Sequence, residues 1–355
     1  MNTFIYLVKF IASMGVIIGH TRFPGTFGFV WDAISRYICP FFFAISGRFL
    51  IPYSMRNTED IRKRVGKAIR KLLKTTGVVY LIYLVYSLLF HLKNGIGFGE
   101  WFTSKFNLSE ARWFFLFNSG KFIYDGSYTF DHLWYLFALF YVFGLIYIFA
   151  PVLRKWYKFL VVILLAGLYF GELLQTFYPI RPFDISITTW YVLRNWLFEG
   201  MPFVLIGIWF SDYIGKLKED LSEDEYRIRS KKWIIPGFIG IIAGMVISSA
   251  EFLLLGKKEC PFGALLMVLG ILFLSETGIG GGKYLWKIGK EGSSNIYFYH
   301  VLVICLVDQL SYYGVLPDIS MGAKPFVIMA LCLLFIWFIP RTIKKYSCKK
   351  TRYKR

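Results

Sequence analysis

Charged residues are scarce in this chain of 355 residues, at 18% of the total, and the acidic ones are especially few, with 22 Asp and Glu against 41 Lys and Arg. Soluble domains carry about 25% charged residues. The hydrophobic share is 56% and the aromatic share 20%. This leaves too much apolar surface for one water-facing core and too little charge to cover it. The composition therefore excludes a disordered chain and an ordinary soluble enzyme.

Cysteine is also rare, and familiar catalytic motifs are missing. No two cysteines form a CxxC pair, and three of them fall inside apolar runs, where a thiol behaves as a small hydrophobic group. We therefore predict no disulfide, no metal site and no bound cofactor. The sequence contains no Gly-rich P-loop, no HExxH and no GxSxG. The five cysteines are Cys39, Cys260, Cys305, Cys332 and Cys348.

Long apolar runs recur from one end of the chain to the other. About 20 apolar residues are needed for a helix to cross ~30 Å of hydrocarbon, and the runs lack the alternation of a barrel strand. The sequence thus predicts an all-α, polytopic bundle of about ten spans, in which the eighth is short. The spans are Phe4 to Gly19, Ile34 to Ile51, Thr75 to Phe90, Leu133 to Val152, Phe159 to Leu174, Trp190 to Phe210, Trp233 to Leu255, Phe262 to Leu274, Ile296 to Leu310 and Pro325 to Ile339.

The distribution of Lys and Arg predicts the orientation of these spans. Connections on one side hold 28 of the 41 basic residues. Because basic loops stay in the cytoplasm, we expect both termini on the cytoplasmic side. We expect the protein to lie in the cell membrane. The first run carries Lys9 and has no cleavage site, so we expect it to remain as a span. We expect a single membrane domain over residues 1–355, with 341–355 as a basic cytoplasmic tail.

The excess of positive charge does not indicate nucleic acid, because the basic residues cluster at the ends of apolar runs. The strongest cluster runs from Arg56 to Lys74 and includes Arg62 and Arg64. It has two interpretations, an anchor on anionic membrane lipid or a cradle for a phosphate-bearing donor. Residue types alone leave both open.

Ionisable residues inside spans are costly and are therefore candidate functional groups. Lys9 and His20 lie eleven residues apart, which places both on one helix face with about 16 Å between them. A His can move a proton near neutral pH, so His20 could deprotonate an acceptor hydroxyl. The alternative is a snorkelling lysine and an interfacial histidine.

Three further residues stand out in the other spans. His132 opens the fourth span in DHLWYL, where it could bind an acceptor or make a structural hydrogen bond beside Trp134. His300 lies in the ninth span, and we interpret it as a structural or channel-lining group. Glu199 is the costliest acid to leave unpaired, and either Arg36 or Arg194 could neutralise it.

Three markers occur in a fixed order along the chain. They are Lys9, ten intervening residues, His20 and then CPFFFAISGRFL; the segment DHLWYLFALFYVFGLIYIFAPVL; and SSNIYFYHVLV, which includes Tyr297 and His300. Together they resemble the acyltransferase 3 family of multi-pass membrane acyltransferases. The first segment also resembles the membrane part of the vancomycin-resistance serine racemases, which carry a soluble catalytic domain after it; from the basic segment KKYSCKKTRYKR after the tenth span, we expect no racemase domain here.

The resemblance implies a membrane O-acyltransferase that moves an acetyl group from cytoplasmic acetyl-CoA to a hydroxyl of a cell-envelope glycan or lipid-linked acceptor. It makes His20 the catalytic base or acyl carrier, with Lys9 as its partner. The family usually has Arg at the Lys9 position and an aromatic residue at the Arg48 position. Lys9 therefore offers a point charge instead of a planar guanidinium, and Arg48 is an additional cation.

On this basis, we expect an acceptor site formed by His132, Trp134 and Glu199. We expect Arg48, Arg62, Arg64 and Ser46 to bind the donor or line its path. Two other classes stay open: a transporter or flippase without acyl chemistry, which uptake without acetyl-CoA would favour, and a scaffold for an envelope-synthesis complex.

Overall fold

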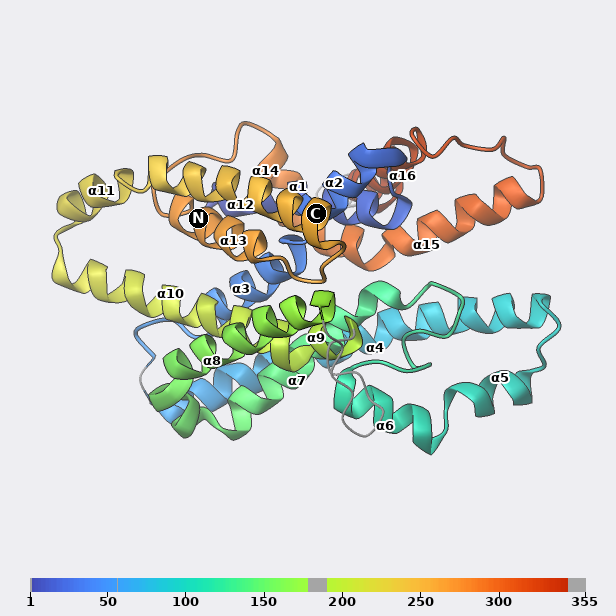
Figure 1. The fold of residues 1–355 in the computed structure, drawn as a ribbon, viewed down its shortest axis with the longest axis horizontal. Coiled ribbons are helices and arrows are strands. Elements are labelled where there is room, and N and C mark those ends of the chain that lie inside the picture. Colours follow the sequence, from blue (N-terminus) through green and yellow to red (C-terminus); the bar gives the residue numbers. More distant parts are fainter. Residues whose placement is uncertain (1, 56, 178–189, 344–355) are drawn as a thin grey trace, which may run out of the picture.

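The computed structural model describes residues 2–55, 57–177 and 190–343, and all its regular elements are helical (Figure 1). The basic tail lies outside the described residues from position 344 onward. The longer helices are α1 (Thr3–Thr21), α2 (Gly25–Ser35), α3 (Ile38–Leu50), α4 (Thr58–Lys93), α6 (Leu108–Phe117), α7 (Trp134–Ile148), α8 (Ala150–Phe177), α10 (Met201–Asp220), α12 (Ile234–Leu255), α13 (Phe262–Leu274) and α15 (Ser293–Tyr312). The shorter helices are α5 (Phe98–Lys105), α9 (Trp190–Leu193), α11 (Glu223–Lys231), α14 (Leu285–Glu291) and α16 (Lys324–Cys332), with a π-helical turn after α16 at Leu333–Phe338.

Each predicted span coincides with helical structure, which confirms the all-α, polytopic fold. Within the described residues, eight segments are long and apolar enough to cross a membrane. The other two predicted spans are α13, which has only 13 residues, and α15, which carries His300 and Asp308 among its apolar residues.

Two predicted spans are broken at polar residues, and the fourth, Leu133 to Val152, also crosses the junction of α7 and α8 at Phe149. The second is divided at Arg36 and Tyr37 between α2 and α3. The sixth is interrupted before a π-helical turn, η3 (Trp196–Gly200), where the Asn195 side chain accepts hydrogen bonds from the next turn's amides. Both breaks put polar side chains deep in the bundle, because interrupted helices need polar partners for their free backbone groups.

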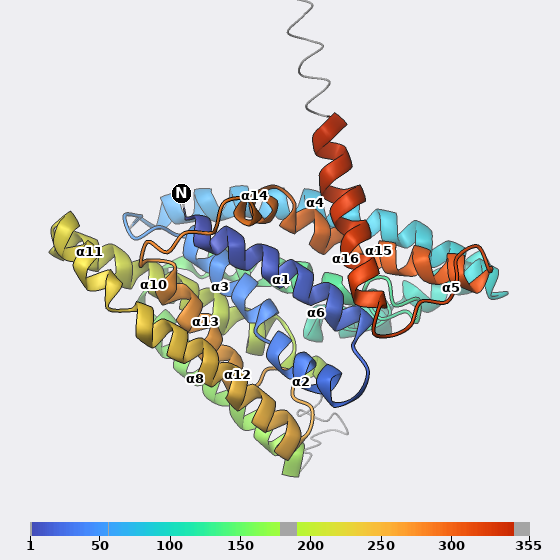
Figure 2. The same cartoon turned by 90° about the horizontal axis from the view of Figure 1, so that it is seen from above.

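The basic cluster predicted as a connection is helical in the structure. Helix α4 begins at Thr58 and has 36 residues, so most of the Arg56 to Lys74 segment forms its first turns. Asn57 caps this helix through its side chain. In Figures 1 and 2, the start of α4 and the α10–α11 connection lie at one end of the molecule, and α5 lies at the opposite end.

Helices α3 and α10 cross with their backbones in contact. A Cβ added at Gly47 would lie 1.9 Å from the Val204 carbonyl oxygen, and one at Gly207 would lie 1.9 Å from that of Ala44. Small residues allow this close approach in membrane bundles. Because η3 leads directly into α10, the crossing also holds η3 against α3.

We expect Gly207→Ala to lower the free energy of unfolding by about 2 kcal/mol, because the two helices must separate to admit the methyl group. Denaturant unfolding in detergent measures the change. Gly77→Ala in α4 is the matched control, since nothing lies within 4 Å of its added Cβ. Equal loss of stability in both variants would contradict a tight α3–α10 crossing.

The long loop between α4 and α7 is held by a buried ion pair. Lys105 Nζ lies 2.8 Å from Asp125 Oδ2, and both side chains are almost fully buried. Burial alone would raise the pKa of Asp125, but Lys105 and the hydroxyls of Ser87 and Ser127 hold it below its ordinary value. This network closes the loop over the end of the bundle at which α7 begins.

Candidate active site

Three histidines from three separate helices meet inside the bundle. The ring centroids of His20 and His300 are 5.1 Å apart, as are those of His132 and His300, and His20 and His132 are separated by 6.3 Å. His132 and His300 are buried, whereas His20 exposes its side chain to a cavity. The structure thus brings together the three His of the sequence markers; His20 and His132 both line this cavity, and His20 is the more exposed of the two.

Hydrogen bonds define which nitrogens of the two buried rings carry protons. His132 Nε2 lies 3.1 Å from the Phe298 carbonyl oxygen, and His300 Nδ1 lies 2.8 Å from that of Tyr297. A carbonyl oxygen only accepts, so we assign the protons to these nitrogens. His132 Nδ1 and His300 Nε2 then remain as buried acceptors, and neither has a partner among the described residues.

The 3-10 helix η1 (Asp131–Leu133), directly before α7, is joined to α15 in both directions. His132 bonds the carbonyl of Phe298, while the Tyr297 hydroxyl donates to the carbonyl of His132. The Tyr83 hydroxyl, from α4, donates to the same Phe298 carbonyl at 2.7 Å. Removing one of these bonds would leave a buried polar group without a partner. The histidine cluster is therefore held in place by three helices.

A cavity of about 260 Å³ opens beside His20. Four basic and four acidic side chains contribute to its wall, so its charge is balanced. Trp134 contributes an aromatic face, over which the Arg194 guanidinium lies 4.8 Å from the ring centroid. The ionisable side chains other than histidine are Arg22, Arg36, Arg194, Lys257, Asp32, Asp131, Glu199 and Glu259.

Glu259 is the centre of the ionic wall of this cavity. Arg36 Nη1 lies 2.7 Å from Glu259 Oε2, and Arg194 Nη1 lies 3.6 Å from it. Arg36 also contacts Asp32, which pairs with Lys257 at 3.0 Å. The short segment between α12 and α13 carries Glu259, and sequence reasoning missed it because a lone acid in a connection gives no specific signal.

The pairing of Glu259 predicts an acid-sensitive site. Burial alone would raise its pKa, but Arg36, Arg194 and Lys257 hold the pKa below its ordinary value of 4.5. A depressed pKa in the folded state contributes stability that is present above the unfolded value and lost as pH falls through the folded value.

We therefore expect the unfolding temperature to fall as pH drops below 4.5, and Glu259→Gln to remove part of that dependence. Thermal unfolding across pH 3 to 7 measures it. The outer loop's Asp125 adds a similar contribution, so the comparison between variant and parent isolates Glu259. Identical pH profiles for both proteins would contradict the pairing.

Glu199 is buried on η3 and lines the same cavity. Its Oε2 atom has no hydrogen-bond partner in the described part of the chain. The sequence left open whether Arg36 or Arg194 pairs with Glu199. In the structure, both arginines form ion pairs with Glu259. A buried carboxyl oxygen aimed at a cavity is available to a ligand hydroxyl.

A second cavity, of about 400 Å³, lies further along α1 toward the basic ends of the helices. Lys9, Lys71 and Ser46 line it among apolar side chains, and the Ser46 hydroxyl lies 3.3 Å from that of Tyr135. We call this second cavity the inner cavity and the cavity beside His20 the outer cavity. Tyr297 lines both. Lys9 and His20 therefore face different cavities that adjoin at Tyr297.

The three arginines predicted to bind the donor contact protein groups. Arg48 forms an ion pair with Glu276 and a hydrogen bond with Ser275. Arg62 donates to carbonyl oxygens at the end of α7, and Arg64 to those at the end of α3. None of the three lines the inner cavity. Among the residues predicted to bind the donor, Ser46 alone lies on its wall.

Comparison with known proteins identifies the family of the chain. A family model described as an acyltransferase domain matches residues 2–346, which is nearly the whole chain. The chain belongs to the acyltransferase 3 family. No curated protein and no solved structure matches it. Family membership and the apolar helices together make it a multi-pass membrane acyltransferase.

Proposed function

We propose that this acyltransferase moves an acetyl group from acetyl-CoA to a hydroxyl of an envelope glycan or related acceptor, at the outer cavity. The observation that carries the proposal is the exposed ring of His20, which lies against two buried histidines and beside the junction of two cavities. A base within hydrogen-bond reach of the acceptor hydroxyl is what acyl transfer requires.

In the proposed reaction, a ring nitrogen of His20 takes the proton of the acceptor hydroxyl. The hydroxyl oxygen attacks the thioester carbonyl, the carbon–sulfur bond breaks, and the thiolate takes up the proton. The products are an acetyl ester and free CoA. A second route has His20 carry the acetyl group briefly before the acceptor receives it. The unprotonated ring nitrogens of His132 and His300 accept hydrogen bonds, so they would hold a group with an N–H or O–H bond in place beside His20.

The inner cavity is the proposed path of the donor's arm. Its wall is mostly apolar, which suits a pantetheine arm, and Lys9 and Lys71 supply positive charge for the donor's polar groups. Tyr297 would stand where the thioester meets the acceptor. The outer cavity suits an acceptor rich in hydroxyl groups, because Glu199 offers a hydrogen-bond acceptor and the charged side chains of the wall offer further hydrogen-bond partners, with Trp134 beneath the Arg194 guanidinium.

The test is release of free CoA by the purified protein in nanodiscs, measured with a thiol reagent. Acetyl-CoA is supplied with hydroxyl acceptors from cell-envelope extracts, and acetyl esters in the products are measured by mass spectrometry. We expect thiol release and ester formation in equal amounts. Absence of both with every acceptor, together with substrate uptake by proteoliposomes that lack acetyl-CoA, would overturn the proposal in favour of transport.

Lys9 gives a more specific prediction. We expect Lys9→Met to raise the KM for acetyl-CoA about tenfold with a smaller change in kcat, because a charge-assisted hydrogen bond contributes about 1.5 kcal/mol or more. Lys67→Met is the control, since this exposed α4 lysine does not line the inner cavity. An unchanged KM in the Lys9 variant would remove Lys9 from the donor path.

A further inference from the structure

A third cavity lies apart from the two just described. It has a volume of about 300 Å³ and lies where the end of α7 and the start of α8 meet α10 and the segment after α3. It shares no lining residue with either the inner or the outer cavity. Its floor is apolar and includes Ile146, Leu205 and Ile208, all of which are buried.

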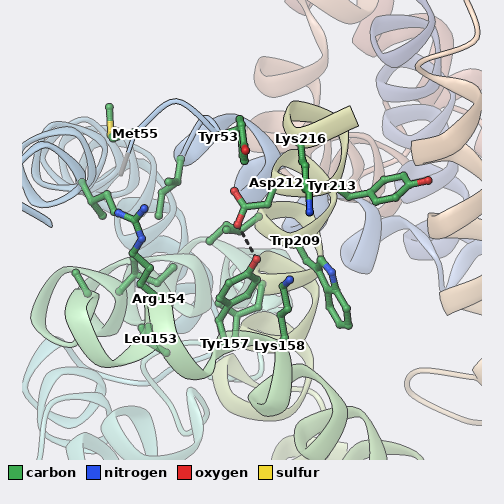
Figure 3. A pocket seen from close by; sticks show the side chains of 16 residues that line it. Tyr53, Met55, Leu153, Arg154, Tyr157, Lys158, Trp209, Asp212, Tyr213 and Lys216 are labelled. Atoms are coloured by element: carbon green, nitrogen blue, oxygen red, sulfur yellow. Dashed lines mark hydrogen bonds between the residues drawn. The ribbon is translucent and has the colours of Figure 1, made fainter. Parts of the chain in front are cut away.

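The rim of this cavity is positively charged. Arg154, Lys158 and Lys216 contribute three cations against one acid, Asp212, which accepts a 2.6 Å hydrogen bond from the Tyr157 hydroxyl. In Figure 3, Arg154 lies on one side of the Tyr157–Asp212 pair and the two lysines on the other. None of the three cations has a carboxylate within 4.0 Å in the described ranges. The rim is therefore complementary to an anion.

The surface beside the rim carries exposed aromatic side chains. Trp156 and Phe159 are about half exposed on α8, and Trp209 is 36% exposed on α10. Lys158 Nζ lies 5.8 Å from the centre of the Trp209 ring. Exposed tryptophan beside lysine is typical of the level of the lipid headgroups. The cavity thus opens where a phosphate group and an acyl chain of the same molecule are found.

We propose that this cavity binds one anionic phospholipid from the leaflet at the basic ends of the helices. The lysines and Arg154 hold its phosphate, and an acyl chain occupies the apolar floor. Charge complementarity and the exposed aromatic residues carry this assignment. A lipid in this cavity would contact α8, α10 and the segment after α3 at the same time, and would therefore join these three segments.

Native mass spectrometry of the full chain, purified in mild detergent and supplied with phosphatidylglycerol or phosphatidylcholine, tests the site. We expect a retained adduct of one phosphatidylglycerol and none of phosphatidylcholine. Each cation near an anionic lipid contributes about a five-fold preference, so we expect Arg154→Ala/Lys158→Ala/Lys216→Ala to bind about a hundredfold more weakly. Lys63→Ala/Lys67→Ala/Arg70→Ala removes three exposed cations of α4 and should keep the adduct.

Lys216→Glu provides a milder variant, because this side chain is exposed and its substitution leaves the core intact. It should also weaken the adduct. Equal binding in the rim variants and the α4 control would overturn the proposal. So would displacement of the adduct by free CoA at micromolar concentration, which would assign the cavity to a soluble phosphate compound instead.

Discussion

His20→Ala should lower the rate of CoA release by about a thousandfold while leaving the protein folded. General base catalysis contributes about 10²- to 10⁴-fold, and removal of the exposed His20 ring would take that contribution away. His132 and His300 are buried, and their protonated nitrogens bond carbonyl oxygens of α15. Thiol release at saturating acetyl-CoA measures the effect, and circular dichroism checks the helical content.

His91→Ala is the matched control for this prediction. His91 lies at the far end of α4, contacts the carbonyl oxygens of Ser87 and Asp125, and lines neither the inner nor the outer cavity. Its loss should leave turnover within about threefold. His20→Ala with parental turnover would exclude His20 from the mechanism, whatever the outcome for the lipid site.

Arg36→Met should lower the free energy of unfolding by about 3 kcal/mol, the largest stability change that we expect in the outer cavity. Arg36 joins Glu259 and Asp32 across the break between α2 and α3, and its side chain is only 14% exposed. Removing one member of a buried ion pair costs about 3 to 5 kcal/mol, and we expect the lower end of this range because Glu259 keeps Arg194 and Asp32 keeps Lys257 as partners. Denaturant unfolding in detergent measures the loss.

The double variant Arg36→Met/Glu259→Gln separates the pair from the packing of Arg36. Because it removes both charges, it should recover most of the stability lost in the single variant. A double variant as unstable as Arg36→Met would show that the arginine acts through packing against Phe252, which lies 5.9 Å from its guanidinium. An Arg36→Met protein as stable as the parent would contradict the ionic wall.

The sequence by itself determined the fold class, the approximate position of each span and the family. Apolar runs of about 20 residues can be satisfied only by helices in lipid, so composition decides these features without tertiary contacts. The same argument located His20 near the end of the first span. It did not locate the breaks at Arg36 and Asn195, because a single polar residue in an apolar run does not show whether its side chain caps a new helical turn, as Asn195 does, or pairs with a distant acid, as Arg36 does with Glu259.

Only the tertiary structure decided which of the marked residues share a site. His20, His132 and His300 come from α1, the start of α7 and α15, and packing alone brings their rings within about 6 Å. Packing also placed Lys9 and His20 on different cavities, which adjoin at Tyr297 of α15.

Tertiary packing also decided which groups the charged side chains contact. Arg48, Arg62 and Arg64 were expected, from the family resemblance and their charge, to bind the donor, yet their side chains contact Glu276 and the carbonyl groups at helix ends. Glu259 gave no signal in the sequence because its importance comes from two arginines on other segments. Helix formation in lipid is a local property of the chain, whereas the contacts that make a site depend on which helices pack together.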